Sequence, residues 1–127
     1  MAESIQVSGL THGDNPIPTA SRRGKYVMTS AVLGLDRVTR TIAEAPEEQC
    51  RLVFENLGAI LQECGLDWSH VLKLTFYADP KMSKQPINDQ WLRLFPDAAA
   101  RPARHIIVSQ TLPGKVKIQC EAFAVGD

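Results

Sequence analysis

The segment from Pro46 to Cys64 has the most regular spacing of apolar residues in the chain, and it constrains the fold most. Apolar side chains recur there at steps of three and four along one face: Cys50, Val53, Phe54, Leu57, Ile60, Leu61 and Cys64. Pro46 suits the first position of a helix, and Glu47 and Glu48 complement the helix dipole in its first turn. Gly65 suits a left-handed stop. The segment therefore predicts an amphipathic helix with both of its cysteines in the core.

The helix needs an apolar sheet face to pack against, and the segment Val71–Ala78 supplies one. Its residues alternate between two faces, with Leu72, Leu74 and Phe76 on one and Lys73, Thr75 and Tyr77 on the other. A period of two is typical of a strand with one face covered. We expect the helix to cover the apolar face of this strand.

The remaining elements follow from turn residues and shorter patterns. Residues 5–10 fit a short strand, residues 11–18 an ordered loop, and Arg22, Arg23 and Lys25 a solvated turn. β-Formers over 25–32 predict a buried strand, and residues 83–95 predict a shorter helix that carries Asn88. Residues 104–110 and 116–125 fit two more strands, separated by a Pro-Gly turn signal. The predicted order is β-α-β-α-β-β, an α+β fold class in which residues 1–127 form a single domain.

The balance of charge excludes several classes of function. The chain has 14 Lys and Arg residues against 14 Asp and Glu, so it lacks the positive field that draws proteins to nucleic acid. The first six residues lack the basic and apolar stretches of a leader, and no window holds enough continuous apolar residues to cross a bilayer. We therefore expect a cytoplasmic protein with no nucleic-acid partner and no membrane partner.

The sequence carries no motif for a metal ion or a cofactor. It has no Gly-rich phosphate loop and no G-x-S-x-G elbow, and its three histidines, His12, His70 and His105, stand singly. Cys50 and Cys64 lie about 21 Å apart along the helix, at roughly 1.5 Å per residue, so they cannot form a disulfide with each other. We expect neither a metal nor a cofactor.

The last predicted strand has one polar face, which bears on self-association. Its apolar residues point one way and its polar residues the other: Val116, Ile118, Cys120 and Ala122 against Lys117, Gln119 and Glu121. Two helices on one side leave the opposite face of a small sheet uncovered, and association between copies of the chain usually covers such a face. Because burying an unpaired polar group costs about 1–3 kcal/mol, we expect a wet cleft between copies.

Arg104 is the strongest candidate for a ligand-binding side chain. It follows Pro102-Ala103 near the start of a predicted strand, and its planar guanidinium matches the two oxygens of a carboxylate. A lone arginine at a strand end is also compatible with simple solvation. The residue alone leaves these two interpretations open.

Read in order, several segments resemble the YjgF/RidA (reactive intermediate deaminase) family. The resemblance rests on Val27–Ser30, the helix 49–65 with Asn56-Leu57, Asp67–Thr75, Ile87-Asn88, Pro102-Ala103-Arg104, and the stretch from Leu112-Pro113 to Glu121-Ala122. It implies a chorismate-mutase-like α+β fold in which three subunits pack their sheets into a central barrel, with ligand clefts between subunits. It also implies that the last strand lies between the first and second major strands, so the Pro113-Gly114 turn leads a crossing connection.

The resemblance also implies an activity. In the family's active members, the arginine matching Arg104 binds the carboxylate of a 2-imino acid or enamine, and water attacks the C=N carbon to give ammonia and a 2-oxo acid. A backbone carbonyl, here that of Ile106, orients the water, and a glutamate on the last strand supplies protons. Ser30, Ala31 and Asn88 are the further candidate substrate-binding residues.

This chain departs from the family pattern at positions that bear on catalysis and specificity. Gln119 stands where the catalytic glutamate belongs, and an amide cannot act as a general acid. Glu121 shares its face but lies about 7 Å further along the strand. Ala31 replaces a glycine, and its methyl group would narrow the cleft or shift the ligand, while residues 17–22 offer no tyrosine to the cleft. Gln119, Glu121 and the Ile106 carbonyl are therefore the candidate catalytic groups, with an altered substrate expected.

Three functions follow from these features. The first is an imine or enamine deaminase, or a related hydrolase, that anchors its substrate on Arg104. The second is a non-catalytic trimer that binds a small carboxylate as a sensor or scavenger, which the glutamine at 119 favours. The third, an RNA-cleaving activity associated with some family names, needs a basic surface that a chain of isoelectric point about 6.8 does not have, and it ranks last.

Overall fold

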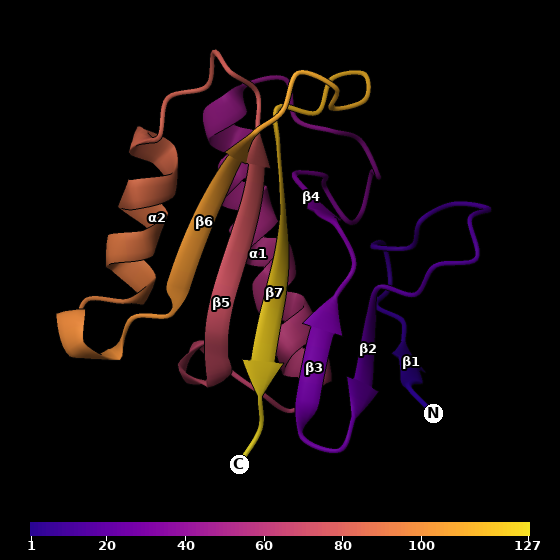
Figure 1. Cartoon of the computed structure of the whole chain (residues 1–127). Helices are drawn as coiled ribbons and strands as arrows, with labels where there is room; N and C mark the ends of the chain where they lie inside the picture. The colour runs from indigo at the N-terminus through magenta and orange to yellow at the C-terminus, as the bar shows by residue number, and fades with distance from the viewer.

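Two helices lie on one side of a mixed β-sheet in the computed structural model, which describes residues 1–127 (Figure 1). The strands are β1 (Glu3–Ile5), β2 (Ala20–Arg23), β3 (Tyr26–Thr29), β4 (Val32–Leu33), β5 (Val71–Ala78), β6 (Ala103–Val108) and β7 (Ile118–Val125). The helices are α1 (Pro46–Glu63) and α2 (Gln85–Leu94), and single 3-10 turns lie at Trp68–His70 and Ala98–Ala100. Neither α-helix is long and apolar enough to span a membrane.

The order of the strands places the last one at the centre of the sheet. The order is β1-β2-β3-β7-β5-β6, with β4 also paired to β7, and all pairs are antiparallel except β5 with β6. Strand β7 therefore lies between β3 and β5, as the family resemblance implies. The chain crosses β5 after β6, so the turn at Pro113-Gly114 does not form a hairpin, and β6 is left as an edge strand.

Helix α1 confirms the predicted amphipathic segment almost residue for residue. It begins at Pro46 and ends at Glu63, and Gly65 has a positive φ of 71° just beyond it. Cys50 and Cys64 are buried, as predicted, together with the periodic apolar residues between them. In Figure 1 this helix runs behind β5 and β7, and it forms the centre of the core.

Two polar residues of α1 are buried and tie the helix to the segments around it. The Gln49 amide group donates to the carbonyls of Ala43 and Lys115, and its oxygen accepts from the backbone N–H of Lys117, each at 2.8 Å. Asn56 donates to the carbonyls of Leu33 and Leu35 at 2.9 and 3.0 Å. These bonds satisfy backbone groups that would otherwise be buried without partners.

The prediction for Leu72 was wrong, because β5 contains a bulge. Val71 pairs with Ala124 and Lys73 with Phe123, so Leu72 is an extra residue in the ladder. An inserted residue shifts the alternation by one position. Leu72 is therefore 53% exposed, and Val71 takes the buried position instead.

The amino-terminal third also differs from its prediction. The predicted strand over 25–32 is two strands, β3 and β4, with Ser30 and Ala31 between them. Of the predicted turn residues, Lys25 lies in a turn, but Arg22 and Arg23 belong to strand β2, which forms a hairpin with β3. The predicted strand over 5–10 is only Glu3–Ile5. The hairpin forms because Gly24 adopts a φ of 58°, which the two-residue connection requires.

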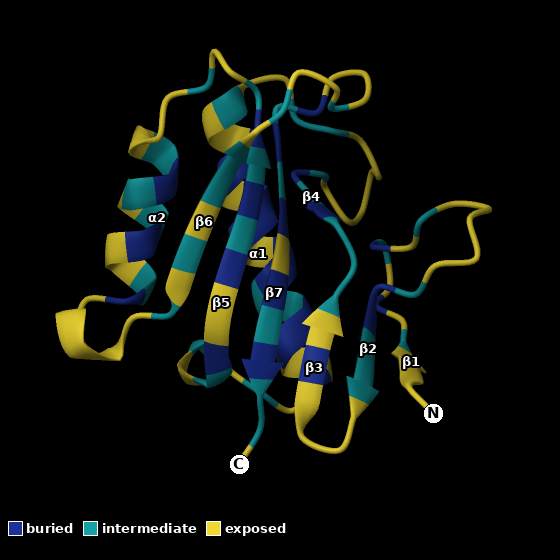
Figure 2. Cartoon of the chain, in the orientation of Figure 1, coloured by how far each residue is buried: buried dark blue, intermediate teal, exposed yellow.

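The sheet face turned away from the helices is open, since no helix lies in front of it in Figure 1. In Figure 2, buried residues alternate with intermediate or exposed ones along β7 and along most of β5. Residues that alternate with the core positions on β3, β5 and β7 lie on this open face: Tyr26, Met28, Lys73, Thr75, Tyr77, Gln119, Glu121 and Phe123. Tyr26 and Met28 are 53% and 56% exposed. Tyr26 stacks on Phe123 with 6.3 Å between ring centroids, so adjacent apolar side chains are exposed together on this face, as they are at many interaction sites.

Candidate functional site

Arg104 projects from β6 toward the helices. Its Cα pairs with that of Leu74, a core residue, and paired residues of neighbouring strands point to the same face. The guanidinium carbon lies over the indole ring of Trp91 on α2, 5.0 Å from the ring centroid. Strand β6 and helix α2 therefore present Arg104 at the seam between them.

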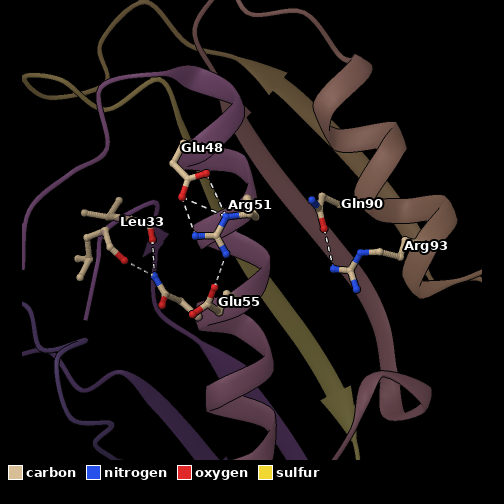
Figure 3. Close-up of polar contacts among 8 residues, drawn as sticks. Leu33, Glu48, Arg51, Glu55, Gln90 and Arg93 are labelled. Carbon is tan, nitrogen blue, oxygen red and sulfur yellow. Dashed lines mark hydrogen bonds and ion pairs between the residues drawn. The ribbon is translucent and has the colours of Figure 1, made fainter. Parts of the chain in front are cut away.

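The guanidinium of Arg104 has no hydrogen-bonding partner in the chain. Of the eight arginines, six donate side-chain hydrogen bonds: Arg22, Arg37, Arg40, Arg51, Arg93 and Arg101. Figure 3 shows two of them, Arg51 held by Glu48 and Glu55, and Arg93 held by Gln90. Of the other two, Arg23 is exposed on a hairpin, whereas Arg104 is half-buried.

Arg104 combines partial burial with unused hydrogen-bond donors. Desolvation lowers the pKa of its guanidinium, but an arginine side chain stays protonated under any condition in which a protein is folded. A partly desolvated cation with five N–H donors gains more from a carboxylate than an exposed one does, because the local dielectric is lower. The geometry therefore fits recognition of a carboxylate.

Helix α2 brings a second predicted residue to the same seam. Asn88 lies three residues before Trp91, so the two side chains share one side of the helix. Ile106 lies two residues after Arg104 on β6, and its Cα pairs with that of Phe76. The structure thus groups Asn88, Arg104 and Ile106 along α2 and the edge strand.

Ser30 and Ala31 lie elsewhere, between β3 and β4. The Ser30 hydroxyl donates to the carbonyl of Pro18 at 2.7 Å, and its backbone N–H donates to the carbonyl of Thr19 at 3.0 Å. Ala31 lines a small cavity of about 30 Å³ together with His12 and Thr19. Strands β7 and β5 separate this loop from β6 within one chain.

Gln119 and Glu121 project from β7 onto the open face. Their Cα atoms pair with those of Tyr77 and Thr75. Glu121 lines a hollow of about 330 Å³ in that face, whose other lining residues are Met28, Thr29, Lys73, Thr75, Ala122 and Phe123. Gln119 is not among them.

The predicted site residues therefore form three groups within one chain. Arg104, Asn88 and Ile106 lie at the helix-bearing edge, Gln119 and Glu121 on the open face, and Ser30 and Ala31 in the β3–β4 loop. The sequence did not single out Trp91, because an apolar residue at helical spacing is typical of the core. Two features of the sequence could have pointed to Trp91: it lies one turn after Asn88, and its helix directly precedes the strand that carries Arg104.

His70 contacts Asp127 and lies apart from these three groups. Its Nδ1 accepts from the backbone N–H of Asp67 at 3.1 Å, and its Nε2 lies 3.2 Å from Oδ2 of Asp127. Asp127, the first of several causes, raises the pKa of His70 above its usual value. No group of three His, Cys, Asp or Glu side chains is arranged to hold a metal ion.

The fold defines a class of protein. A mixed sheet with the last strand between β3 and β5, and two helices on one face, is the α+β arrangement of YjgF/RidA-type structures. The family model described as Endoribonuclease L-PSP matches residues 15–126, and the chain belongs to this family of YjgF/RidA-like proteins.

Two curated relatives and two solved structures illustrate the similarity. The chain is 33% identical over 110 residues to Reactive Intermediate Deaminase A, chloroplastic, of Arabidopsis thaliana, covering 86% of this chain and 58% of that protein. It is 29% identical over 126 residues to the 2-iminobutanoate/2-iminopropanoate deaminase of Salmonella typhimurium, covering 98% of each. The structure of E. coli TdcF with bound serine matches with a TM-score of 0.87 at 26% identity, over 98% of this chain and 99% of that one. The structure of the E. coli YjgF gene product matches in fold, with a TM-score of 0.86 at 24% identity over 98% and 99% of the two chains.

Proposed function

We propose that this protein is a cytoplasmic homotrimer that binds a small carboxylate metabolite in clefts between subunits and hydrolyses the C=N bond of a 2-imino acid or its enamine, without a cofactor. The observation that carries this proposal is the half-buried guanidinium of Arg104, which contacts the Trp91 ring but has no hydrogen-bonding partner in the chain. The deaminase names of the Arabidopsis and Salmonella relatives support the reaction class.

The chemistry assigns a separate step to each group. Arg104 grips the carboxylate with two parallel N–H donors, and the Ile106 carbonyl orients a water molecule toward the imine carbon. The water oxygen bonds to that carbon and one water proton passes to the nitrogen, which gives a carbinolamine. The proton of its hydroxyl group then passes through solvent to the nitrogen, the C–N bond breaks, ammonia leaves, and a 2-oxo acid remains.

Clefts between subunits would unite groups that one chain keeps apart. Arg104 lies on the helix-bearing side of β6, whereas Gln119 and Glu121 lie on the open face of β7. A neighbouring copy packed by its open face against the edge strand β6 would bring its β7 residues toward Arg104. The exposed aromatic and aliphatic residues of the open face, Tyr26 and Met28, favour such packing.

Two substitutions argue that the substrate differs from that of the family's active members. The Ala31 methyl narrows the region between β3 and β4, and residues 17–22 provide no tyrosine wall. A change in pocket shape of one methyl group alters discrimination between substrates by roughly 10- to 200-fold. We therefore expect activity to depend strongly on the side chain of the imino acid.

The second candidate function is a non-catalytic sensor or scavenger of small carboxylates. Gln119 favours it, because an amide hydrogen-bonds water and ligand but transfers no proton. This candidate retains Arg104 as the anchor and requires only binding.

Release of the 2-oxo acid tests both candidates. An amino-acid oxidase generates 2-iminopropanoate or 2-iminobutanoate in situ, and 2-oxo acid formation is followed with wild type, Arg104→Ala and Arg23→Ala. Arg23 is the matched control because it is the other arginine without a side-chain hydrogen bond. We expect acceleration by wild type and Arg23→Ala only. Absence of any Arg104-dependent acceleration eliminates deamination of these small 2-imino acids, and Arg104-dependent binding of pyruvate without acceleration supports the sensor.

A further inference from the structure

The indole of Trp91 contacts Arg104 through the face of its ring, so the contact uses none of the guanidinium N–H groups. The guanidinium carbon lies 5.0 Å from the ring centroid, within the distance at which a cation is attracted to the negative face of an aromatic ring. A contact with the ring face leaves the five N–H donors of the guanidinium available. Trp91 therefore holds the charge of Arg104 while leaving its donors for a ligand.

Trp91 is itself fixed by a chain of aromatic contacts that leads to the core. Its ring meets that of Phe95 edge-on at 4.8 Å, and Phe95 meets Trp68 edge-on at 5.8 Å. Trp68 in turn packs 6.1 Å from Phe54 of α1. Arg101 donates to the carbonyl of Phe95 at 2.9 Å and fixes the end of α2. Trp91 is only 8% exposed, so its ring has little freedom to move.

We propose that Trp91 is the positioning residue that prepares Arg104 to receive a carboxylate, an inference that rests on the proposed function of Arg104. A free arginine side chain has many rotamers, and binding in one of them costs conformational entropy. Holding the guanidinium over a fixed ring removes part of that cost before the ligand arrives. The indole also excludes water from one side of the cation, which strengthens its attraction to an anion.

The affinity for 2-oxobutanoate, measured by titration calorimetry, tests this role. The variants are Trp91→Phe, which keeps a ring, and Trp91→Leu, which keeps only apolar bulk. We expect Trp91→Leu to weaken binding by roughly 3- to 30-fold, the range that a partly desolvated cation–π contact supplies, and Trp91→Phe to lie between it and wild type. Because Trp91 acts on ground-state binding, KM for an imino acid should rise by more than kcat falls.

Two controls separate positioning from packing. Trp68→Leu removes a second indole, which does not touch Arg104 and supports Trp91 only through Phe95, so it should weaken the affinity clearly less than Trp91→Leu does. In an Arg104→Gln background, which has no cation, Trp91→Leu should change the affinity by less than about 2-fold, because coupled residues lose their effect when one partner is removed. The urea midpoint and oligomeric state of each variant are measured alongside.

The results distinguish failure of this inference from failure of the proposed function. If Arg104→Gln binds 2-oxobutanoate as tightly as wild type, the proposed role of Arg104 is wrong. If Arg104→Gln binds more weakly but Trp91→Leu matches wild type, only the positioning role of Trp91 is overturned. An equal loss in Trp68→Leu overturns it as well. If Trp91→Leu does not fold, the effect of Trp91→Phe, measured with Arg104 intact and in the Arg104→Gln background, decides the question.

Discussion

Arg104 and Gln119 project from opposite faces of the same sheet. Arg104 pairs with the core residue Leu74 of β5, and Gln119 pairs with Tyr77, three residues further along the same strand. Because successive side chains of a strand alternate between faces, Leu74 and Tyr77 point to opposite sides of the sheet. The family resemblance had implied that both residues belong to one catalytic site. Within a single chain the sheet itself separates them, so a site that uses both requires a second copy.

Mixed assemblies test whether the two residues act across subunits. Arg104→Ala removes the anchor and Gln119→Trp fills the space at the other position, so each homogeneous variant should fail to bind 2-oxobutanoate. When the two variants are unfolded together and refolded at equal amounts, about a quarter of the clefts should combine an intact Arg104 with an intact Gln119. Calorimetry on the mixture should recover that fraction of sites. Zero recovered sites would mean that one chain supplies both residues.

Alanine substitutions at Gly34, just after β4, and at Gly58 in α1 should have opposite effects on stability, because only Gly34 lies against the backbone of α1. A Cβ on Gly34 would lie 2.5 Å from the Cα of Gln49 and closer still to its carbonyl oxygen, so the backbone must move. We expect Gly34→Ala to lower the free energy of unfolding by about 1–3 kcal/mol. Gly58 is the control: its Cβ would meet the Trp68 ring at an ordinary 3.6 Å, and helix propensity should make Gly58→Ala about 0.5–1 kcal/mol more stable. Urea denaturation measures both, and equal effects would refute the predicted close approach.

The contact between His70 and Asp127 predicts a pH dependence of stability. The folded pKa of His70 is raised, mainly by Asp127, so protonated His70 favours the folded state. This stabilisation is complete below the unfolded histidine pKa near 6.5 and is lost as the pH rises through the higher folded value. The urea midpoint of wild type should therefore fall relative to that of His70→Gln as the pH rises above about 6.5. A difference between the two proteins that stays constant with pH would contradict the assignment.

Local patterns predicted the elements best where one periodicity dominates. The helix bounded by Pro46 and Gly65 and the strand Val71–Ala78 were correctly located because burial on one face fixes their spacing. Leu72 was placed on the wrong face, since a bulge depends on how β7 pairs with β5. The position of β7 between β3 and β5 came from the family resemblance, because the contacts between strands distant in sequence leave no local pattern.

The candidate site divides along similar lines. Arg104 was identified from its residue type and its neighbours in sequence, and the structure gives it an environment suited to an anion. Its separation from Gln119 depends on which sheet face each strand presents, and this follows from the register of β6 and β7 rather than from spacing. Gln49 and Asn56 are polar helix residues, which the sequence alone would place at the surface. Their burial is tolerated because their amides hydrogen-bond to backbone groups of other segments.

Restoring a carboxylic acid at position 119 tests whether only the proton donor is missing. Gln119→Glu keeps the length of the side chain and adds a group able to transfer protons, which in other enzymes contributes roughly 10²- to 10⁴-fold to the rate. We expect 2-oxo acid release from 2-iminobutanoate to rise by about 10²-fold, and the gain to disappear in the Gln119→Glu/Arg104→Ala double variant. Glu121→Gln is the control for the other carboxylate of the same face. If Gln119→Glu gives no gain while it still binds 2-oxobutanoate, the lack of an acid at position 119 does not limit the reaction. Ala31 is then the next residue to change.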